Sequence, residues 1–113
     1  MKLVILESPY AGRDSKVEGE IEKNVEYSRA CLRDSLLRGE SPLASHLLYT
    51  QPNVLDDTDP TERAMGIEAG LAWGIHAHAT VVYVDRGFSR GMEQGVRRAI
   101  REGRPVHVRR LRQ

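Results

Sequence analysis

The sequence predicts an α/β fold, in which one domain is built on a doubly wound parallel sheet with helices on both faces. Short apolar or β-branched runs alternate along the chain with longer amphipathic segments. Strands that alternate with helices in this way form parallel sheets through right-handed crossovers. The chain has 113 residues, of which 40% are hydrophobic and 29% charged, which suits one globular core. We expect a single domain over residues 1–113, with about four to five strands in a Rossmann-like or flavodoxin-like arrangement.

The first half of the chain predicts two strands around one helix. Residues 2–7 are a short continuous apolar run, typical of a strand buried on both faces. Residues 8–19 are rich in glycine, serine and charge and predict a loop. Residues 20–38 predict an amphipathic helix that ends at Gly39, and a short strand with a turn or helical piece follows within 41–49. The apolar residues expected on the buried face of the helix are Ile21, Val25, Leu32 and Leu36.

The second half predicts two further helices and two strands. Asp59 is a good N-cap for a helix that begins with a proline and ends near His76. Residues 80–84 are the clearest strand, because all of them are β-branched or aromatic. Ser89 can cap the last helix, and residues 105–111 predict the last strand. The residues expected on the two buried helix faces are Ala64, Ile67, Leu71 and Ile75, then Met92, Val96, Ala99 and Ile100.

Composition argues against several classes of protein. The formal net charge is +1, and a single cysteine, Cys31, excludes an internal disulfide. The N-terminal apolar run ends at Leu6, too short for a signal peptide or a membrane span, so we expect a cytoplasmic protein without a membrane partner. The histidines are scattered and have no clustered ligands, so we expect neither a metal nor another cofactor. Arginines crowd the C-terminal region without interleaved aromatic residues, which favours a solvated or oligomer-facing surface over a nucleic-acid interface.

Polar residues follow the first two predicted strands at their carboxyl ends, where open parallel sheets bind ligands. The first loop begins with Ser8 and Pro9, and its Tyr10, followed by Gly12, offers a flat face and a polar tip for a base or a sugar. His46 follows the second strand and is the natural acid–base group near neutral pH. The alternatives are structural, with the tyrosine closing the sheet edge and the histidine making an internal hydrogen bond.

The loop after the third strand suits an anion. Gly87 and Gly91 allow the backbone to approach a ligand, and Ser89 begins a helix whose free N–H groups favour phosphate or carboxylate. A capped helix after an ordinary glycine turn is the simpler alternative. Asp85 could hold a ribose hydroxyl or be only a turn residue. Arg63 could reach a phosphate or form an exposed salt bridge.

Four segments together resemble the nucleoside 2-deoxyribosyltransferase-like superfamily. They are the Ser-Pro-Tyr-Ala-Gly loop at 8–12, the Ser-x-Gly-Met start of the last helix at 89–92, the Ala-x-x-x-Gly-x-Pro-Val segment at 99–106, and the Pro-x-x-x-His segment at 42–46. The likeness covers nearly the whole chain and is closest to a small uncharacterised phage and bacterial branch. It implies a homo-oligomer, since this superfamily often completes its sites across a dimer.

The resemblance also implies chemistry at an N-glycosidic bond. Members with known activity use a glutamate near the start of the third helix as the nucleophile on C1′, the logic of a retaining glycosidase. The Gly-Met-Glu-x-Gly segment makes Glu93 that nucleophile, beside Met92 as a ligand contact. Counting back four residues from Ala99 instead places the nucleophile position on Gly95. Residues 93 and 95 lie about 200° apart around a helix, and the predicted apolar face slightly favours the register with Gly95. Glu7 and Asp85, at strand ends, are alternative acids.

The expected function is binding of a nucleoside or nucleotide, with cleavage or exchange of its N-glycosidic bond through Glu93. In this enzyme, Asp85 or His46 assists and Tyr10 orients the sugar. The alternative is a catalytically silent module that senses or sequesters a nucleotide signal, which the glycine at position 95 favours. A third hypothesis, a structural protein that acts through an interface, is supported by Trp73 and the arginine-rich end.

Overall fold

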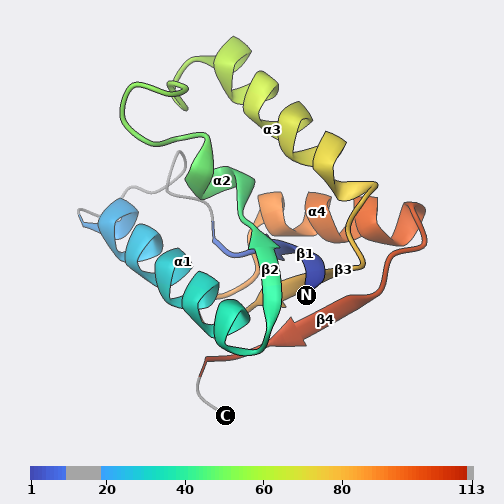
Figure 1. Ribbon diagram of the computed structural model, residues 1–113. Helices are drawn as coiled ribbons and strands as arrows, with labels where there is room; N and C mark the ends of the chain where they lie inside the picture. The colour runs from blue at the N-terminus through green and yellow to red at the C-terminus, as the bar shows by residue number, and fades with distance from the viewer. Residues whose placement is uncertain (10–18, 112–113) are drawn as a thin grey trace.

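A computed structural model describes residues 1–9 and 19–111, and these residues confirm the α/β fold (Figure 1). They form one four-stranded sheet in which every neighbouring pair of strands is parallel. In spatial order the strands are β2 (Glu40–Leu43), β1 (Lys2–Glu7), β3 (Ala79–Tyr83) and β4 (Val106–Arg109).

Helices cover both faces of this sheet, as Figure 1 shows. On one face lies α1 (Glu20–Leu37), and α4 (Arg90–Arg101) packs on β3 and β4 from the other. Between β2 and β3 the chain forms two helices, the short α2 (Ser45–Leu48) and the longer α3 (Pro60–Gly74), which pack against each other. No helix in the described ranges is long and apolar enough to cross a membrane.

Alternation along β1 divides its side chains between the two faces. Val4 and Leu6 are buried in the core on the α1 face, whereas Ile5 and Glu7 line a cavity on the α3 and α4 face. Glu7 is in register with Val82 of β3, the strand against which α4 packs. The core cluster on the α1 face consists of Val4, Leu6, Cys31, Ala44, Ala79, Val81 and Tyr83.

Both predicted helix caps are confirmed. The side chain of Asp59 accepts a hydrogen bond from the Thr61 amide at 3.2 Å, and α3 begins at Pro60. Ser89 accepts from the Met92 amide at 3.3 Å and so begins α4. These caps satisfy backbone N–H groups that the first turn of a helix leaves without partners.

The predicted buried face of α1 is wrong in part, although Leu32 packs against the core as expected. Ile21 and Leu36 are about half exposed, at 48% and 53%, and the helix instead buries Asn24, Ser28, Cys31 and Ser35. These polar residues find partners elsewhere in the fold: Ser28 bonds Ser8 at 2.8 Å, and Ser35 donates to Glu40 at 2.7 Å. Hydrogen bonds to residues outside α1 therefore offset the usual cost of burying polar groups.

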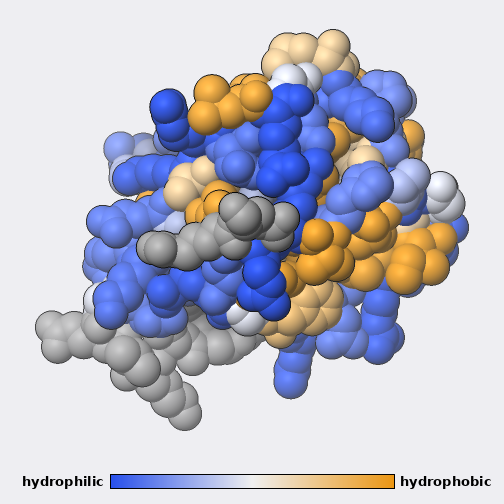
Figure 2. Space-filling view, turned by 90° about the horizontal axis from the view of Figure 1, so that it is seen from below, coloured by the Kyte–Doolittle hydropathy of each residue, from blue (hydrophilic) through white to orange (hydrophobic). Residues whose placement is uncertain are grey.

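The predicted faces of α3 and α4 are wrong in part. In α3 the buried residues are Gly70 and Gly74, whereas Ile75 is 63% exposed. In α4 the predicted Met92 and Ala99 are buried, but Ile100 is 67% exposed. The face of the molecule shown in Figure 2 is mostly hydrophilic, with its largest hydrophobic group towards the right of the view and smaller ones elsewhere.

Candidate functional site

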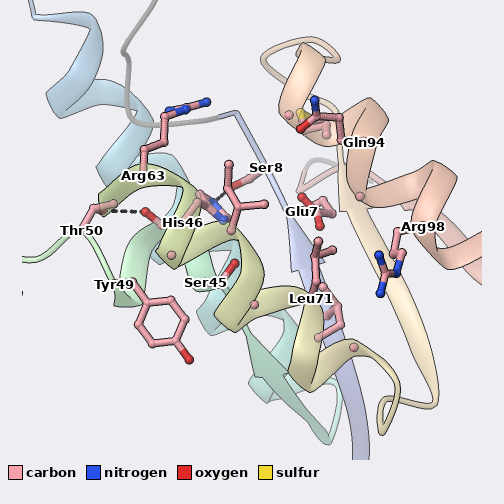
Figure 3. Close-up of a pocket in the computed structure, with 18 of the residues that line it drawn as sticks. Glu7, Ser8, Ser45, His46, Tyr49, Thr50, Arg63, Leu71, Gln94 and Arg98 are labelled. Atoms are coloured by element: carbon pink, nitrogen blue, oxygen red, sulfur yellow. Dashed lines mark hydrogen bonds between the residues drawn. The ribbon is translucent and has the colours of Figure 1, made fainter. Parts of the chain in front are cut away.

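A cavity of about 310 Å³ lies between α3 and α4 where β1 ends (Figure 3). Its volume is at the lower end of the range for small-molecule sites, roughly 300–1,000 Å³. Apolar side chains form much of the lining, and they are Ile5, Leu55, Ile67, Leu71 and Met92. Polar groups that reach the cavity include Glu7, Ser8, Ser45, His46 and Gln94. Five arginines also line it, namely Arg63, Arg97, Arg98, Arg101 and Arg104.

Glu7 brings a carboxyl group into this cavity from the end of β1. Figure 3 shows it between α3 and α4. Burial raises the pKa of Glu7 to about 8, although the Arg104 guanidinium acts in the opposite direction. Among the described residues the carboxyl group has no hydrogen-bond partner, and its oxygens remain open to the cavity, since no fully buried side-chain oxygen lacks a partner. At neutral pH the group is therefore largely protonated, and it can donate a hydrogen bond into the cavity.

Gly95 of α4 makes the space that Glu7 occupies. A Cβ atom at position 95 would overlap the Glu7 carboxyl group. Glu93, two residues earlier, does not line the cavity and pairs with Arg97 at 2.7 Å at the surface. The helix therefore turns position 95, and not position 93, towards the end of β1.

His46 is held at the inner end of the cavity by two serines. Its Nε2 lies 2.7 Å from the Ser8 hydroxyl and 3.4 Å from that of Ser28, and the two hydroxyls are 2.8 Å apart. Burial lowers the pKa of His46 to about 4, so the ring is neutral at neutral pH. Ser8 is only 3% exposed, so this group of residues fixes the imidazole rather than presenting an open nucleophile.

The arginines give the cavity a basic rim. Arg63 of α3 pairs with Asp57 at 3.2 Å, and Arg98 of α4 pairs with Glu102 at 2.7 Å. Arg101 has no ion pair with any described residue. Guanidinium groups at a cavity mouth bind phosphate and carboxylate well.

Arg104 has a different position from these rim arginines. It is buried at 9% exposure, and it donates to the Thr80 hydroxyl at 2.9 Å and to the Gly74 carbonyl at 2.6 Å. It also pairs with Glu102 at 2.6 Å. These contacts join β3, the end of α3 and the end of α4, so Arg104 supports the cavity structurally.

The structure brings some of the predicted site residues to the cavity and places others away from it. Ser8, His46, Arg63, Gly91 and Met92 line it. Those that do not line it are Pro9, Asp85, Gly87, Ser89 and Glu93. Tyr10 and Gly12 lie outside the described residues.

Asp85 lies beside α1. It accepts hydrogen bonds from the Tyr27 hydroxyl at 2.6 Å and from the Leu111 amide at 2.9 Å. The loop that contains it turns at Gly87, where φ is 98°. In this structure Asp85 therefore connects α1 to the end of the chain after β4.

Sequence reasoning missed much of the α4 side of the cavity. Gln94, Arg98 and Arg101 follow one another at intervals of four and three residues, so they share a helix face with Gly91 and Gly95. That periodicity was available in the sequence, but the apolar residues of α4 defined a different face. Among the described residues no three His, Cys, Asp or Glu side chains are grouped so that they could hold a metal ion.

Comparison with known proteins identifies a family but not a function. A family model described as "Domain of unknown function (DUF7768)" matches residues 2–109. No curated protein matches the chain. The matched segment includes every residue that lines the cavity.

Proposed function

The chain belongs to the family described as Domain of unknown function (DUF7768), and from its own side chains we propose that it binds a nucleoside or nucleotide in the cavity between α3 and α4. The observation that carries the proposal is the enclosed Glu7 carboxyl group, which faces the cavity without a described partner. No fully buried side-chain oxygen of the described residues lacks a hydrogen-bond partner, so the oxygens of this carboxyl group are open to whatever occupies the cavity. A ligand with hydrogen-bonding atoms supplies that partner.

The other walls of the cavity fit the parts of a nucleotide. Apolar side chains such as Ile67 and Leu71 can contact the faces of a base, and Gln94 can bond one of its edges. Arg98 and Arg101 lie on α4 one turn apart, where they can hold a phosphate. The ligand class thus combines a flat polar ring with an anionic group.

A thermal-shift panel tests this function. We expect at least one common nucleoside, 5′-monophosphate, cyclic nucleotide or ADP-ribose-type molecule to raise the Tm, because a ligand that binds only the native state stabilises it by mass action. Leu71→Trp should fill the cavity and abolish the shift. Ala72→Trp is the matched control, since Ala72 is the next residue of α3 and is exposed. A flat panel, or equal shifts in both variants, would contradict the proposal.

Cleavage or exchange of the N-glycosidic bond is the second candidate, and Glu7 favours it. A protonated carboxyl group can give its proton to the departing base as the C1′–N bond breaks, while water supplies a hydroxyl group to C1′ and its remaining proton returns to the carboxylate. Binding is proposed first because Glu93, the expected nucleophile, lies outside the cavity.

Release of free base from deoxynucleosides and their 5′-monophosphates separates these candidates. If the protein is an enzyme of this kind, Glu7→Gln should abolish base release. The same substitution at Glu93 shows whether that carboxylate takes part. If no base is released by the wild type, the protein is a silent module that senses or sequesters its ligand.

We also propose that the protein is a homo-oligomer that pairs through α3. Met65 and Trp73 of this helix, and Ile75 directly after it, are more than half exposed, although Ile67 and Leu71 on another side of the helix line the cavity. A helix with apolar residues on several sides normally has partners on several sides, and a second copy would cover the outer ones. Light scattering should give at least a dimer mass, which Met65→Lys should reduce. A monomeric wild type would contradict this.

A further inference from the structure

We propose that Glu7 selects the ligand by donating a hydrogen bond, so that the cavity takes molecules with an acceptor atom, such as a base carbonyl oxygen or ring nitrogen, opposite this carboxyl group. The inference rests on the proposed nucleotide-binding function and assigns the recognition step to one atom group. Its basis is the placement of the side chain at the end of β1, between α3 and α4 (Figure 3).

The space for this carboxyl group is built into the fold. Gly95 carries no side chain at the point where α4 passes β1, and any Cβ atom there would overlap Glu7. Thus the carboxyl group lies against a bare stretch of helix. Gln94 and Arg98, the neighbours of this stretch in the cavity lining, do not bond it.

The hydrogen bonds that a carboxyl group can form depend on its protonation state. An ionised carboxylate only accepts hydrogen bonds, whereas a protonated carboxyl group donates one. Burial raises the pKa of Glu7 to about 8, so near neutral pH the donor form dominates. A ligand acceptor atom that bonds this proton keeps the carboxyl group neutral and gives it a hydrogen-bond partner. An ionised carboxylate without a partner in the same cavity would be neither neutral nor hydrogen-bonded.

The arginines around the cavity keep their charge over the range in which Glu7 titrates. Arg98 and Arg101 of α4, Arg63 of α3 and Arg104 after α4 surround the cavity, and arginine stays charged throughout. The other titratable side chains of the lining, besides His46, are Asp57, Glu62 and Tyr49. The pKa of His46 near 4 leaves that ring neutral. Loss of the Glu7 proton is therefore the protein change expected to weaken binding above pH 8.

The test measures dissociation constants at pH 6.5 and pH 9.5 for adenosine and AMP, whose base does not titrate in this window. The other common ribonucleosides and their 5′-monophosphates are measured at pH 6.5. For the wild type we expect affinity to fall about 30-fold between the two pH values, because only the protonated form binds and each pH unit above the pKa costs about tenfold. Glu7→Gln retains an N–H donor, so it should bind at both pH values with little change. Glu7→Met has a similar length without a donor and should bind weakly at both.

Three results would overturn the inference. One is wild-type binding of equal strength at both pH values, and another is a Glu7→Met variant that binds as the wild type does. Since Glu7→Gln measures any pH dependence that comes from the ligand itself, a fall of the same size in that variant also overturns it. If no nucleoside or nucleotide binds at pH 6.5, the function on which the inference rests is overturned with it, so the two failures are distinguishable.

Discussion

At the scale of single residues, Glu7 opposes folding as the pH rises. Its pKa is about 8 in the folded protein against an ordinary 4.5, so the folded state binds the proton more tightly than the unfolded chain does. The corresponding stability is fully present below about pH 4.5 and is lost as the pH rises through 8. Above pH 8 the folded protein must hold a buried carboxylate that has no described hydrogen-bond partner.

Glu7→Gln should therefore raise the Tm at pH 9 by several degrees and change it little at pH 5, because an amide has no charge to bury. Thermal unfolding followed by circular dichroism across this range measures the effect. Glu93→Gln is the matched control, since Glu93 lies on the surface and the same chemical change there should leave the profile unchanged. Parallel profiles for wild type and Glu7→Gln would show that Glu7 is not a buried acid.

Arg104 is the residue that we expect to matter most for local stability. Replacement by methionine keeps much of its volume but leaves the Thr80 hydroxyl, the Gly74 carbonyl and Glu102 without the partner that now bonds them. We expect a loss of about 2–4 kcal/mol in the free energy of unfolding, the usual cost of breaking a buried polar network. Urea unfolding measures it. Arg101→Met, at an exposed arginine without a described ion pair, should change it by less than about 0.5 kcal/mol, and equal losses would contradict this account.

At the scale of elements, α3 approaches the rest of the fold through glycines one turn apart. A Cβ atom at Gly66 would lie 3.2 Å from Leu55, and one at Gly74 would lie 3.2 Å from the Arg104 guanidinium. At Gly70 it would overlap the side chain of Ser45 in α2. The three glycines thus allow α3 to pack closely against its neighbours, and this close packing positions the outer wall of the cavity.

Gly70→Ala should destabilise the protein by about 1–3 kcal/mol, since an overpacked contact costs more than the helix gains from alanine. Adding Ser45→Gly should recover most of the loss, because it removes the atoms that collide. Gly91→Ala is the control: it is another helical glycine, and the nearest atom to its added methyl group would be 4.0 Å away. Chemical denaturation of the four proteins, wild type included, gives the comparison. A Gly70→Ala variant as stable as Gly91→Ala would show that α3 does not dock closely.

The sequence predicted the strands and helix starts well, because these depend on local signals. Five β-branched or aromatic residues identified β3, and Asp59 and Ser89 marked two helix starts. Helix faces were predicted less well, because they depend on partners outside the helix. Ser28 and Ser35 look like surface residues until Ser8 and Glu40 supply their hydrogen bonds.

The candidate site shows the same division between local and distant information. The rule that ligands bind at the carboxyl ends of parallel strands predicted that Ser8 and His46 belong to one region, and they lie 2.7 Å apart. Glu7 entered only as an alternative acid, since its burial depends on α4 crossing β1 at Gly95. Two features of the sequence could have indicated this burial. They are a charged residue at the end of an apolar strand and a glycine inside a later helix.

At the scale of the whole molecule, three groups shape the dependence of stability on pH. The pKa of Glu40 is lowered to about 2, chiefly by the hydrogen bond from Arg109, so its contribution is lost as the pH falls from about 4.5 to 2. His46, lowered from 6.5 to about 4 by burial, removes stability as the pH falls from 6.5 to 4. Glu7 lowers the stability of the folded state as the pH rises from 4.5 to 8. Since His46 and Glu7 oppose each other between pH 4.5 and 6.5, we expect the maximum of stability in that interval, to be measured as the urea midpoint at each pH.

The loss of stability at acid pH is expected to depend on an ion pair between the two edge strands of the sheet. Glu40 begins β2, Arg109 ends β4, and their side chains are joined at 2.5 and 2.8 Å on the α1 face, where Ser35 adds a third hydrogen bond. Glu40→Gln keeps the shape but removes the charge. It should lower the free energy of unfolding at pH 7 by about 1–3 kcal/mol, because Arg109 then has no counter-charge on β2. The same variant should lose less stability than the wild type between pH 4.5 and 2.5.

The control for this prediction is Glu68→Gln, on the exposed surface of α3, which should follow the wild-type curve at every pH. The outer strands β2 and β4 have a neighbouring strand on one side only, so a side-chain bond between them restrains both edges at once. If Glu40→Gln and wild type lose stability in parallel below pH 4.5, acid unfolding begins elsewhere. The carboxylates of Asp34 and Asp85, whose pKa values are also lowered, would then be the next groups to replace, because they join α1 to β3 and to the segment after β4.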